Sequence, residues 1–288
     1  MVWVVATFYK FVPLSKPEAL RVELLENCLG WGLRGTILLA SEGLNGTVAG
    51  DRPAIDALLT GLHSHPEIGP FPHQEATTAA PPFERMKVKL KREIVTLGRP
   101  DVNPAHRVGT YVEPHDWNQV IADPEVVVID ARNSFEVELG TFKGAVNPQT
   151  RSFRELPGYV DAHLDPAKHP KVAMFCTGGI RCEKATAYLL GQGFGQVYHL
   201  KGGILNYLKT VPADASLWQG DCFVFDERVA LDHQLNPTDH NLCLGCGHPV
   251  SPADQAAPEY EAGISCPHCY AELTPEKRSR LEARQNHR

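Results

Sequence analysis

Short apolar runs alternate with helix-like segments between residues 126 and 210, and this alternation most limits the folds open to the chain. The run from Val126 to Ile129 ends in Asp130, and the run "KVAMF" ends at Cys176. Such continuous apolar runs are typical of strands buried on both faces. "EKATAYLLGQG", "QVYHL" and "GGILNYLKT" follow as helix, strand and helix. The order predicts a parallel sheet covered by helices, with its chemistry beyond the carboxyl ends of the strands, where Asp130 and Cys176 lie.

The segment after the second run is a candidate nucleophile loop. Its two glycines permit a tight curve whose backbone N–H groups point inward, and the start of the next helix adds positive potential. An arginine supplies a permanent positive charge, so three effects favour a thiolate over a thiol. An isolated cysteine at a strand end is more often a packed core thiol, but this context favours catalysis. The predicted cradle, called here the Cys176 loop, is Cys176, Thr177, Gly178, Gly179, Ile180 and Arg181.

The length of the Cys176 loop bears on its substrate. The loop is one residue shorter between cysteine and arginine than the corresponding loop of cysteine phosphatases. A shorter loop makes a smaller cradle, which suits one sulfur atom or a small oxyanion better than a tetrahedral phosphoryl group. Sulfur-type chemistry is therefore favoured over phosphatase activity.

Charged residues and a second cysteine surround the loop in the sequence. Asp130 and Arg132 follow the first apolar run and are expected to support the loop as a buried ion pair, with Glu136 and Glu138 near enough in sequence to join them. A structural salt bridge is the preferred interpretation of these residues. Two interpretations of Cys182 stay open, a thiol that resolves an oxidised Cys176 and a cysteine that faces the core.

The first third of the chain has a different order of elements. A strand over 3–12, a helix over 16–29, a hairpin over 36–50 that turns around Gly43, Asn45 and Gly46, a helix over 52–63 and a strand over 86–92 are predicted. This β-α-β-β-α-β order indicates a ferredoxin-like domain over residues 1–97. A segment rich in proline and glycine, 98–114, is expected to be a linker to the parallel-sheet domain over 115–216. A loop-rich, cysteine-rich unit with a basic tail is expected over 217–288.

Two Cys-x2-Cys knuckles mark the cysteine-rich unit. Nineteen residues separate "CLGC" from "CPHC", a spacing in the zinc-ribbon range, and four thiolates can close a tetrahedral Zn²⁺ site. His248 and His268 are spare candidate ligands, and a redox-active or empty cysteine cluster is the competing interpretation. Cys28 and Cys222 are expected to be packing residues. The predicted zinc ligands are Cys243, Cys246, Cys266 and Cys269.

Composition and the N-terminal sequence indicate which cellular compartment and which partners to expect. No apolar run approaches the roughly 20 residues of a membrane-spanning helix, and the first residues carry no basic leader. We therefore expect a cytoplasmic protein with reduced cysteines and no membrane partner. The net charge of -6 argues against a uniformly basic nucleic-acid binder but allows a local basic face.

Two basic segments are candidates for RNA contact. Lys87, Lys89 and Lys91 alternate along the predicted strand at about 7 Å intervals, close to phosphate spacing, although lysines also protect edge strands from aggregation. The tail over 276–288 carries five basic residues against two acidic ones. A mobile arm that binds RNA phosphates and a solvent-exposed terminal helix without RNA contact explain this excess of basic residues equally well. The basic residues of the tail are Lys277, Arg278, Arg280, Arg284 and Arg288.

Several motifs resemble known families. "VVVIDARNSFEVELGTFKGAVNP", "FCTGGIRCEKA" and "LKGGILNYL" resemble a rhodanese domain in order and spacing. "VGTYVEPHDWN", "ASEGLNGT", "WQGDCFVFDERV" and the cysteine-rich end resemble the bacterial tRNA uridine(34) hydroxylase (TrhO) family. The resemblance implies an acylphosphatase-like N-terminal domain, a central rhodanese domain and a C-terminal cysteine-rich region. It also implies O2-dependent conversion of the wobble uridine in the tRNA anticodon arm to 5-hydroxyuridine, with Cys176 essential.

Three functions remain in competition at this point. A tRNA-modifying oxygenase leads, because a plain sulfurtransferase needs neither flanking domain. A sulfurtransferase that moves sulfane sulfur to an acceptor, with tRNA as one candidate acceptor, is the alternative. A zinc-containing RNA-binding scaffold is disfavoured by an intact Cys176 and Arg181. No flavin, haem or nucleotide site is evident in the sequence, and neither is a two-histidine-one-carboxylate site.

Overall fold

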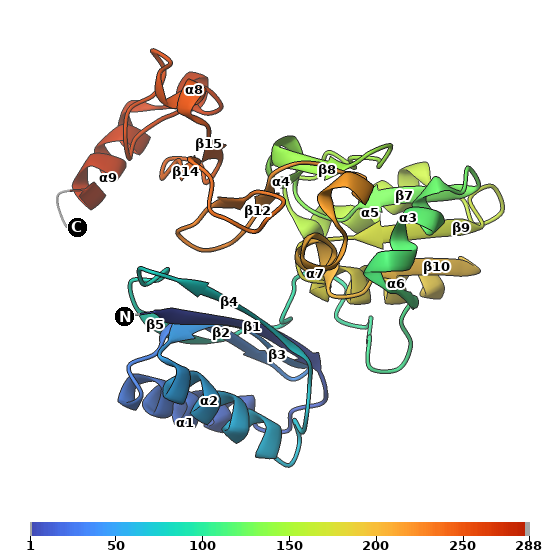
Figure 1. Cartoon of the computed structure of the whole chain (residues 1–288), viewed down its shortest axis with the longest axis horizontal. Coiled ribbons are helices and arrows are strands. Elements are labelled where there is room, and N and C mark those ends of the chain that lie inside the picture. The colour runs from blue at the N-terminus through green and yellow to red at the C-terminus, as the bar shows by residue number, and fades with distance from the viewer. Residues whose placement is uncertain (1, 286–288) are drawn as a thin grey trace.

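The computed structural model describes residues 2–285, and its N-terminal part is a five-stranded sheet with two helices on one face (Figure 1). The sheet order is β4-β1-β3-β2-β5, antiparallel except where β5 runs parallel to β2. The other face turns toward the rest of the chain (Figure 1). The elements are β1 (Trp3–Phe11), α1 (Pro17–Gly30), β2 (Arg34–Ala40), β3 (Gly43–Gly50), α2 (Arg52–Ser64), β4 (His73–Thr78) and β5 (Met86–Leu90).

Helix α2 illustrates how local sequence builds this layer. The Asp51 side chain accepts a hydrogen bond from the Ala54 N–H at 2.9 Å, which satisfies one of the free donors at the helix start. Ile55, Leu58 and Leu62 repeat at helical spacing and are buried against the sheet. Each such side chain contributes about 1.5–3 kcal/mol when it leaves water.

The structure corrects two details of the expected N-terminal domain. The sixth element of the ferredoxin-like order is β4, which pairs with β1, whereas the predicted strand over 86–92 is an additional edge strand beside β2. The hairpin turns at residues 41–42, and Asn45 and Gly46 lie within β3. Gly43 and Gly46 serve close packing instead, since a Cβ there would lie 2.0 Å from the Lys10 carbonyl oxygen and 2.8 Å from the Phe8 ring.

The central part is the expected parallel sheet, in the order β6-β10-β9-β7. Helices pack around it, and a short antiparallel pair, β8 and β11, lies beside it. The strands are β6 (Thr110–Val112), β7 (Val126–Asp130), β8 (Gly140–Phe142), β9 (Lys171–Phe175), β10 (Gln196–Leu200) and β11 (Trp218–Gly220). The helices are α3 (Pro114–Ala122), α4 (Ser134–Leu139), η1 (Phe153–Glu155), α5 (Leu156–His163), α6 (Ile180–Gly191), α7 (Gly203–Thr210) and η2 (Ala213–Ala215).

The segment 98–114, expected to be a linker, contributes to this sheet. Its residues 110–112 form β6, which pairs in parallel with β10. Just before the segment, the buried Leu97 side chain packs in the same core as Met174 and Val197. The connection is therefore anchored on the central domain, although its proline and glycine content resembles that of a free linker.

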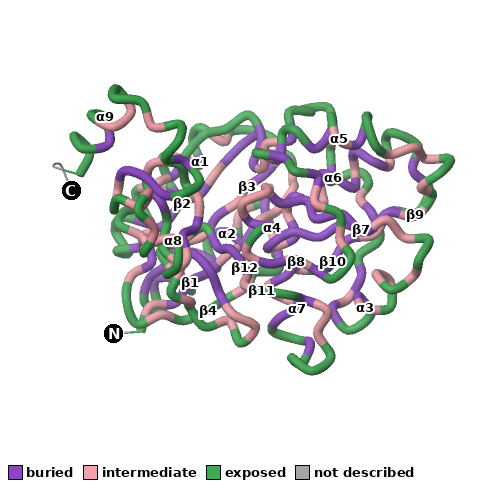
Figure 2. Tube along the Cα trace, turned by 90° about the horizontal axis from the view of Figure 1, so that it is seen from above, coloured by how far each residue is buried: buried purple, intermediate pink, exposed green. Residues whose placement is uncertain are grey.

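The C-terminal part consists of small hairpins and short helices. Cys243, Cys266, Cys269 and Val250 form its buried centre, and Cys246 beside them is exposed. Helix α9 stands at the edge of the molecule with mostly exposed residues (Figure 2). Arg288 of the basic tail lies outside the described residues. The elements are β12 (Cys222–Phe223), β13 (Ala230–Leu231), β14 (Asn241–Leu242), β15 (Pro249–Val250), α8 (Pro252–Gln255), η3 (Tyr270–Glu272) and α9 (Pro275–Gln285).

A buried ion triad joins the N-terminal sheet to the central domain. Lys184 on α6 is fully buried and lies 2.7 Å from a carboxylate oxygen of Glu42 and 2.7 Å from one of Glu93. Glu42 also accepts the Ile94 N–H at 2.7 Å. The triad therefore fixes the helix that follows the Cys176 loop against the first domain. Within residues 2–285, none of the helices has the length and apolar character needed to cross a membrane.

Candidate functional site

The Cys176 loop connects β9 to α6 and is held by backbone contacts. The Gly179 N–H points at the Cys176 Sγ at 3.2 Å, with Gly179 at a φ of 100°, where glycine is favoured. The first turn of α7 donates N–H groups from Ile204 to the Cys176 carbonyl at 2.9 Å and from Leu205 to the Thr177 carbonyl at 3.1 Å. The loop is thus fixed from both sides, as a nucleophile cradle requires.

The electrostatics of the loop favour an ionised sulfur. Burial alone would raise the pKa of Cys176, but the hydrogen bond from the Cys182 thiol, the charge of Arg181 and the N–H groups of Cys182 and Gly179 outweigh it. Together they lower the pKa of Cys176 to about 6. A thiolate therefore predominates at neutral pH, and the thiolate is the nucleophilic form.

Arg181 has a closer partner than the sulfur. Its guanidinium makes a bidentate pair with the Glu136 carboxylate at 2.6 and 2.8 Å, and it also donates to the Thr177 Oγ1 at 3.2 Å. Both charges are buried, and the charge and hydrogen bonds of Arg181 outweigh burial to hold the pKa of Glu136 below its usual range. The pair fixes the end of the loop, so Arg181 acts on the thiolate while already neutralised by Glu136.

The other charged residues expected near the loop lie farther out. Asp130 and Arg132 form a fully buried pair at 2.6 Å, and Arg132 also donates to the Gly140 carbonyl at 2.6 Å. These contacts stabilise the turn between β7 and α4, which agrees with the structural interpretation. Glu138 pairs with His248.

Cys182 lies on the first turn of α6 and is fully buried in the same core cluster as Cys176. Burial, followed by the hydrogen bond and charge of Cys176, raises the pKa of Cys182 well above its usual value. Cys182 is thus a protonated donor to the neighbouring thiolate. Its side chain faces the core, as one interpretation expected, and it also contacts Cys176, so the other interpretation, a resolving thiol, stays a prediction.

A cavity of about 440 Å³ lies over the Cys176 loop, called here the central cavity. It is a feature that the sequence did not reveal, because three separate parts of the chain build its wall. Cys176 lines it although its residue exposure is only 1%. The wall comprises Thr7, Tyr9, Thr36, Leu38, Asn45, Gly46 and Thr47 of the first sheet, Phe83, Lys91, Glu93, Ile94, Val95 and Thr96 from the end of the first domain, Cys176, Thr177, Gly178, Ile180, Arg181 and Leu205 of the central domain, and Val224, Phe225, Asp226 and Arg228.

The wall combines one aromatic surface with polar groups. Phe225 is 65% exposed, and the Arg181 guanidinium lies 5.8 Å from its ring centroid. Asn45 donates its amide N–H to the Ile94 carbonyl at 3.1 Å, so the side-chain orientation is fixed. Such a mixture suits a flat, hydrogen-bonding ligand.

A second cavity, of about 520 Å³, is also lined by Gly178. The hydroxyls of Tyr9 and Tyr111 both donate to the same oxygen of Glu183, each at 2.8 Å, and burial raises the pKa of Glu183. The three side chains tie the first domain to the start of α6. Sequence reasoning missed them, since each lies in a different element.

Two of the lysines expected to follow RNA, Lys87 and Lys89, lie on β5, the strand at one edge of the first sheet, and Lys91 directly follows it. Lys87 is partly buried, and Lys89 and Lys91 are exposed. Lys91 also lines the central cavity. The structure therefore brings this lysine, but not the whole stripe, to the Cys176 loop.

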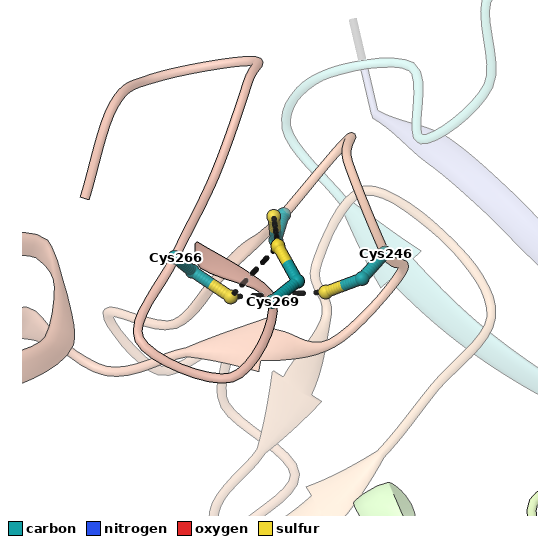
Figure 3. Close-up of side chains that lie close together, drawn as sticks. Cys246, Cys266 and Cys269 are labelled. Atoms are coloured by element: carbon teal, nitrogen blue, oxygen red, sulfur yellow. Dashed lines mark hydrogen bonds between the residues drawn. The ribbon is translucent and has the colours of Figure 1, made fainter. Parts of the chain in front are cut away.

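The knuckle cysteines come together at the centre of the cysteine-rich unit. The sulfurs of Cys246, Cys266 and Cys269 point toward one another in Figure 3. Sulfur-to-sulfur distances are 3.9 Å for Cys243–Cys269, 3.7 Å for Cys246–Cys266 and 3.9 Å for Cys266–Cys269. Four sulfurs about 2.3 Å from one Zn²⁺ in a tetrahedron are about 3.8 Å apart. The arrangement therefore fits a tetrahedral metal site.

Comparisons with known families match both larger domains. A model of the "UPF0176 acylphosphatase like domain" matches residues 3–94, and a model of the rhodanese-like domain matches residues 113–210. Among solved structures, the rhodanese-like domain of an Anabaena protein gives a TM-score of 0.32 at 19% identity, over 38% of this chain and 78% of that one. An acylphosphatase from Coxiella burnetii gives 0.24 at 14%, over 31% and 92%.

The full-length match is to a protein named tRNA uridine(34) hydroxylase from Picosynechococcus sp.. The two sequences are 53% identical over 282 residues, which cover 98% of this chain and 95% of that one. Both the fold class expected from the sequence and the resemblance to this family are confirmed. The chain belongs to the tRNA uridine(34) hydroxylase family.

Proposed function

We propose that this protein hydroxylates the wobble uridine of tRNA at C5, with O2 as the oxygen source and Cys176 as the reactive group. The observation that carries the proposal is a cysteine of lowered pKa, about 6, lining a cavity that all three parts of the chain enclose. The relative named tRNA uridine(34) hydroxylase supports the substrate and the reaction. In the net reaction one oxygen atom of O2 converts C5–H to C5–OH, and the other leaves as water. Two molecules of a small thiol supply the two electrons and two protons for that water and are joined to a disulfide.

The cavity wall suggests how the base is held. Chemistry on a base requires that it leave its stack, and an anticodon loop offers bases that are already unpaired. The exposed Phe225 ring provides a stacking surface, and the fixed amide of Asn45 provides hydrogen bonds for the edge of the base. The Gly179 N–H and Arg181 keep the sulfur anionic beside it. In this role the whole Cys176 loop, 176–181, binds and orients the reacting groups.

The remaining parts bind the rest of the anticodon arm and support the fold. Lys87, Lys89 and Lys91 contact phosphates, and the basic residues of the tail add to the same attraction. Cys243, Cys246, Cys266 and Cys269 hold a structural Zn²⁺, which supplies folding free energy to a unit with a small apolar core. A tRNA substrate places the protein in the cytoplasm. The domains proposed for this division are 1–97, 115–216 and 217–288, joined by 98–114.

Nucleoside mass analysis tests the proposal. Unmodified tRNA is incubated with the protein and a small thiol in air or under argon, and the anticodon fragment is isolated. We expect one added oxygen on uridine 34 in air only, and none with Cys176→Ser. The variant Phe225→Ala should raise the KM for tRNA more than it lowers kcat, since the ring stacks on the base without reacting.

Sulfane-sulfur transfer is the second candidate, favoured by the Gly179 N–H at 3.2 Å from the sulfur, a contact that equally suits a persulfide. The same assay decides between them when thiosulfate is added. If uridine gained sulfur both in air and under argon, the reaction would be sulfur transfer and not hydroxylation. Unchanged tRNA with complete reaction components would contradict both.

A further inference from the structure

Two histidines and a carboxylate meet where the cysteine-rich unit touches the central domain. Glu138 lies on α4, and His248 and His268 lie in the two knuckle loops. One ligand atom of each lies within 4.8 Å of the other two. From this juxtaposition we propose that the three side chains bind a divalent transition-metal ion at a site separate from the four cysteines.

The distances between these side chains are close to those of a coordination sphere. The His248 Nε2 lies 2.9 Å from the Glu138 Oε2. Two ligands about 2.1 Å from one ion and at right angles are about 3.0 Å apart, so an ion can replace the proton that this nitrogen and oxygen share. The rings of His248 and His268 stack with centroids 4.0 Å apart and planes at 16°. The third ligand atom, on His268, lies within 4.8 Å of these two, and its exposed ring turns out of the stack to bind the same ion.

The donor set selects the kind of ion. Two imidazoles and one carboxylate suit Zn²⁺, Fe²⁺, Co²⁺ or Ni²⁺, whereas four thiolates favour Zn²⁺. Three protein ligands leave coordination positions open, and both Glu138 and His268 are exposed, so water completes the sphere. The second site is therefore open to exchange with solvent, whereas three of the four cysteines of the other site are buried.

Aromatic contacts connect this cluster to the central cavity. The Phe135 ring, on the same helix as Glu138, lies 5.7 Å from the His248 ring and 5.1 Å from the Phe223 ring. Phe223 in turn lies 5.0 Å from Phe225, which lines the cavity. An ion bound to one residue of α4 and two of the knuckles would fix the cysteine-rich unit on that helix. It would thereby also fix the position of the Phe225 segment.

Metal binding to the zinc-loaded full-length chain tests the proposal. Zinc stays in the cysteine site because Co²⁺ binds the same ligands less strongly than Zn²⁺. The protein is dialysed against increasing Co²⁺, and bound cobalt and retained zinc are measured per chain. We expect one cobalt ion in addition to one zinc ion. Glu138→Gln and His268→Ala should each weaken cobalt binding by at least about tenfold while the zinc content stays the same.

A matched control and a refuting outcome complete the test. His115→Ala removes an exposed histidine of α3 next to Asp116 and should leave cobalt binding unchanged. If the wild-type chain retained zinc but bound no cobalt, the His248–Glu138 contact would be a hydrogen bond that docks the unit without metal. Cobalt binding that persisted in the double variant Glu138→Gln/His268→Ala would also overturn the site. Neither the cobalt nor the zinc measurement depends on tRNA hydroxylation, so the metal site and the proposed function are tested separately.

Discussion

Replacement of Lys184 by methionine tests how the first domain is fixed to the Cys176 loop. Lys184 is fully buried between Glu42 and Glu93, and the substitution leaves two carboxylates without their shared cation. Removing one partner of a buried ion pair typically costs about 3–5 kcal/mol. Glu42 keeps the Ile94 N–H, and Glu93 keeps those of Leu97 and Gly98. These bonds place the expected loss near the lower end, about 3 kcal/mol.

The loss should depend on pH in a defined direction. Burial alone would raise the pKa of Glu93, but the hydrogen bond and charge of Lys184, with the two N–H groups, lower it. A lowered pKa contributes stability that is present above the unfolded value of about 4.3 and is lost as pH falls through the folded value. Without Lys184 the buried Glu93 carboxylate gains stability on protonation. The difference between wild type and variant should therefore narrow from pH 7 toward pH 4.

Thermal unfolding at several pH values, with matched variants, measures this effect. A loss of about 3 kcal/mol corresponds to a Tm about 6–12 °C lower at pH 7. The triple variant Lys184→Met/Glu42→Gln/Glu93→Gln removes all three charges and should recover most of the loss. A Tm of Lys184→Met within about 2 °C of wild type, or a difference that grows as pH falls, would refute this account of the triad.

Three further substitutions test the loop and the cysteine site. Glu136→Gln leaves the buried Arg181 without its bidentate partner, so the free energy of unfolding should fall by about 3 kcal/mol. Because the charge of Arg181 then acts on Cys176 without neutralisation, thiolate absorbance should titrate below pH 6. Gly203→Ala places a Cβ 2.5 Å from the carbonyl oxygens of Cys176 and Thr177 at a φ of 68°, so it should distort the Cys176 loop and move the thiolate titration toward pH 8.5. Gly158→Ala is the control, because a Cβ at Gly158 has open space around it. Cys269→Ser should remove zinc and make residues 240–275 sensitive to limited proteolysis, while the central domain stays resistant; retained zinc would contradict a four-thiolate site.

Local patterns made the main elements of the fold predictable. The Cys176 loop and the two knuckles are continuous segments whose residue order already contains their geometry, and the apolar runs of β7 and β9 can only be buried strands. Strand β4 was missed because most of its residues are exposed, so its sequence has no alternation to recognise. It forms through backbone pairing with β1. Tertiary pairing determined this element, not local propensity.

The parts of the site that depend on distant segments were not predictable. Lys184 lies on a helix where a solvated lysine is the usual expectation, yet it is fully buried because Glu42 and Glu93 come from another domain. Glu138 and His248 are separated by 110 residues and meet only in the folded chain. The aromatic Phe225 carries no motif, and its place in the central cavity follows from how the cysteine-rich unit packs on α4.

The rate of Cys176 alkylation by iodoacetamide as a function of pH is the most direct test of an ionised sulfur that a small molecule can reach. Burial raises the pKa values of Cys28 and Cys222 to about 12, and burial with the Cys176 contact keeps Cys182 protonated, so these thiols should react slowly. In the zinc-loaded protein, mass mapping should find Cys176 modified first, with a rate that rises through about pH 6. An unmodified Cys176, or a rate that rises only near pH 8.5, would contradict the account.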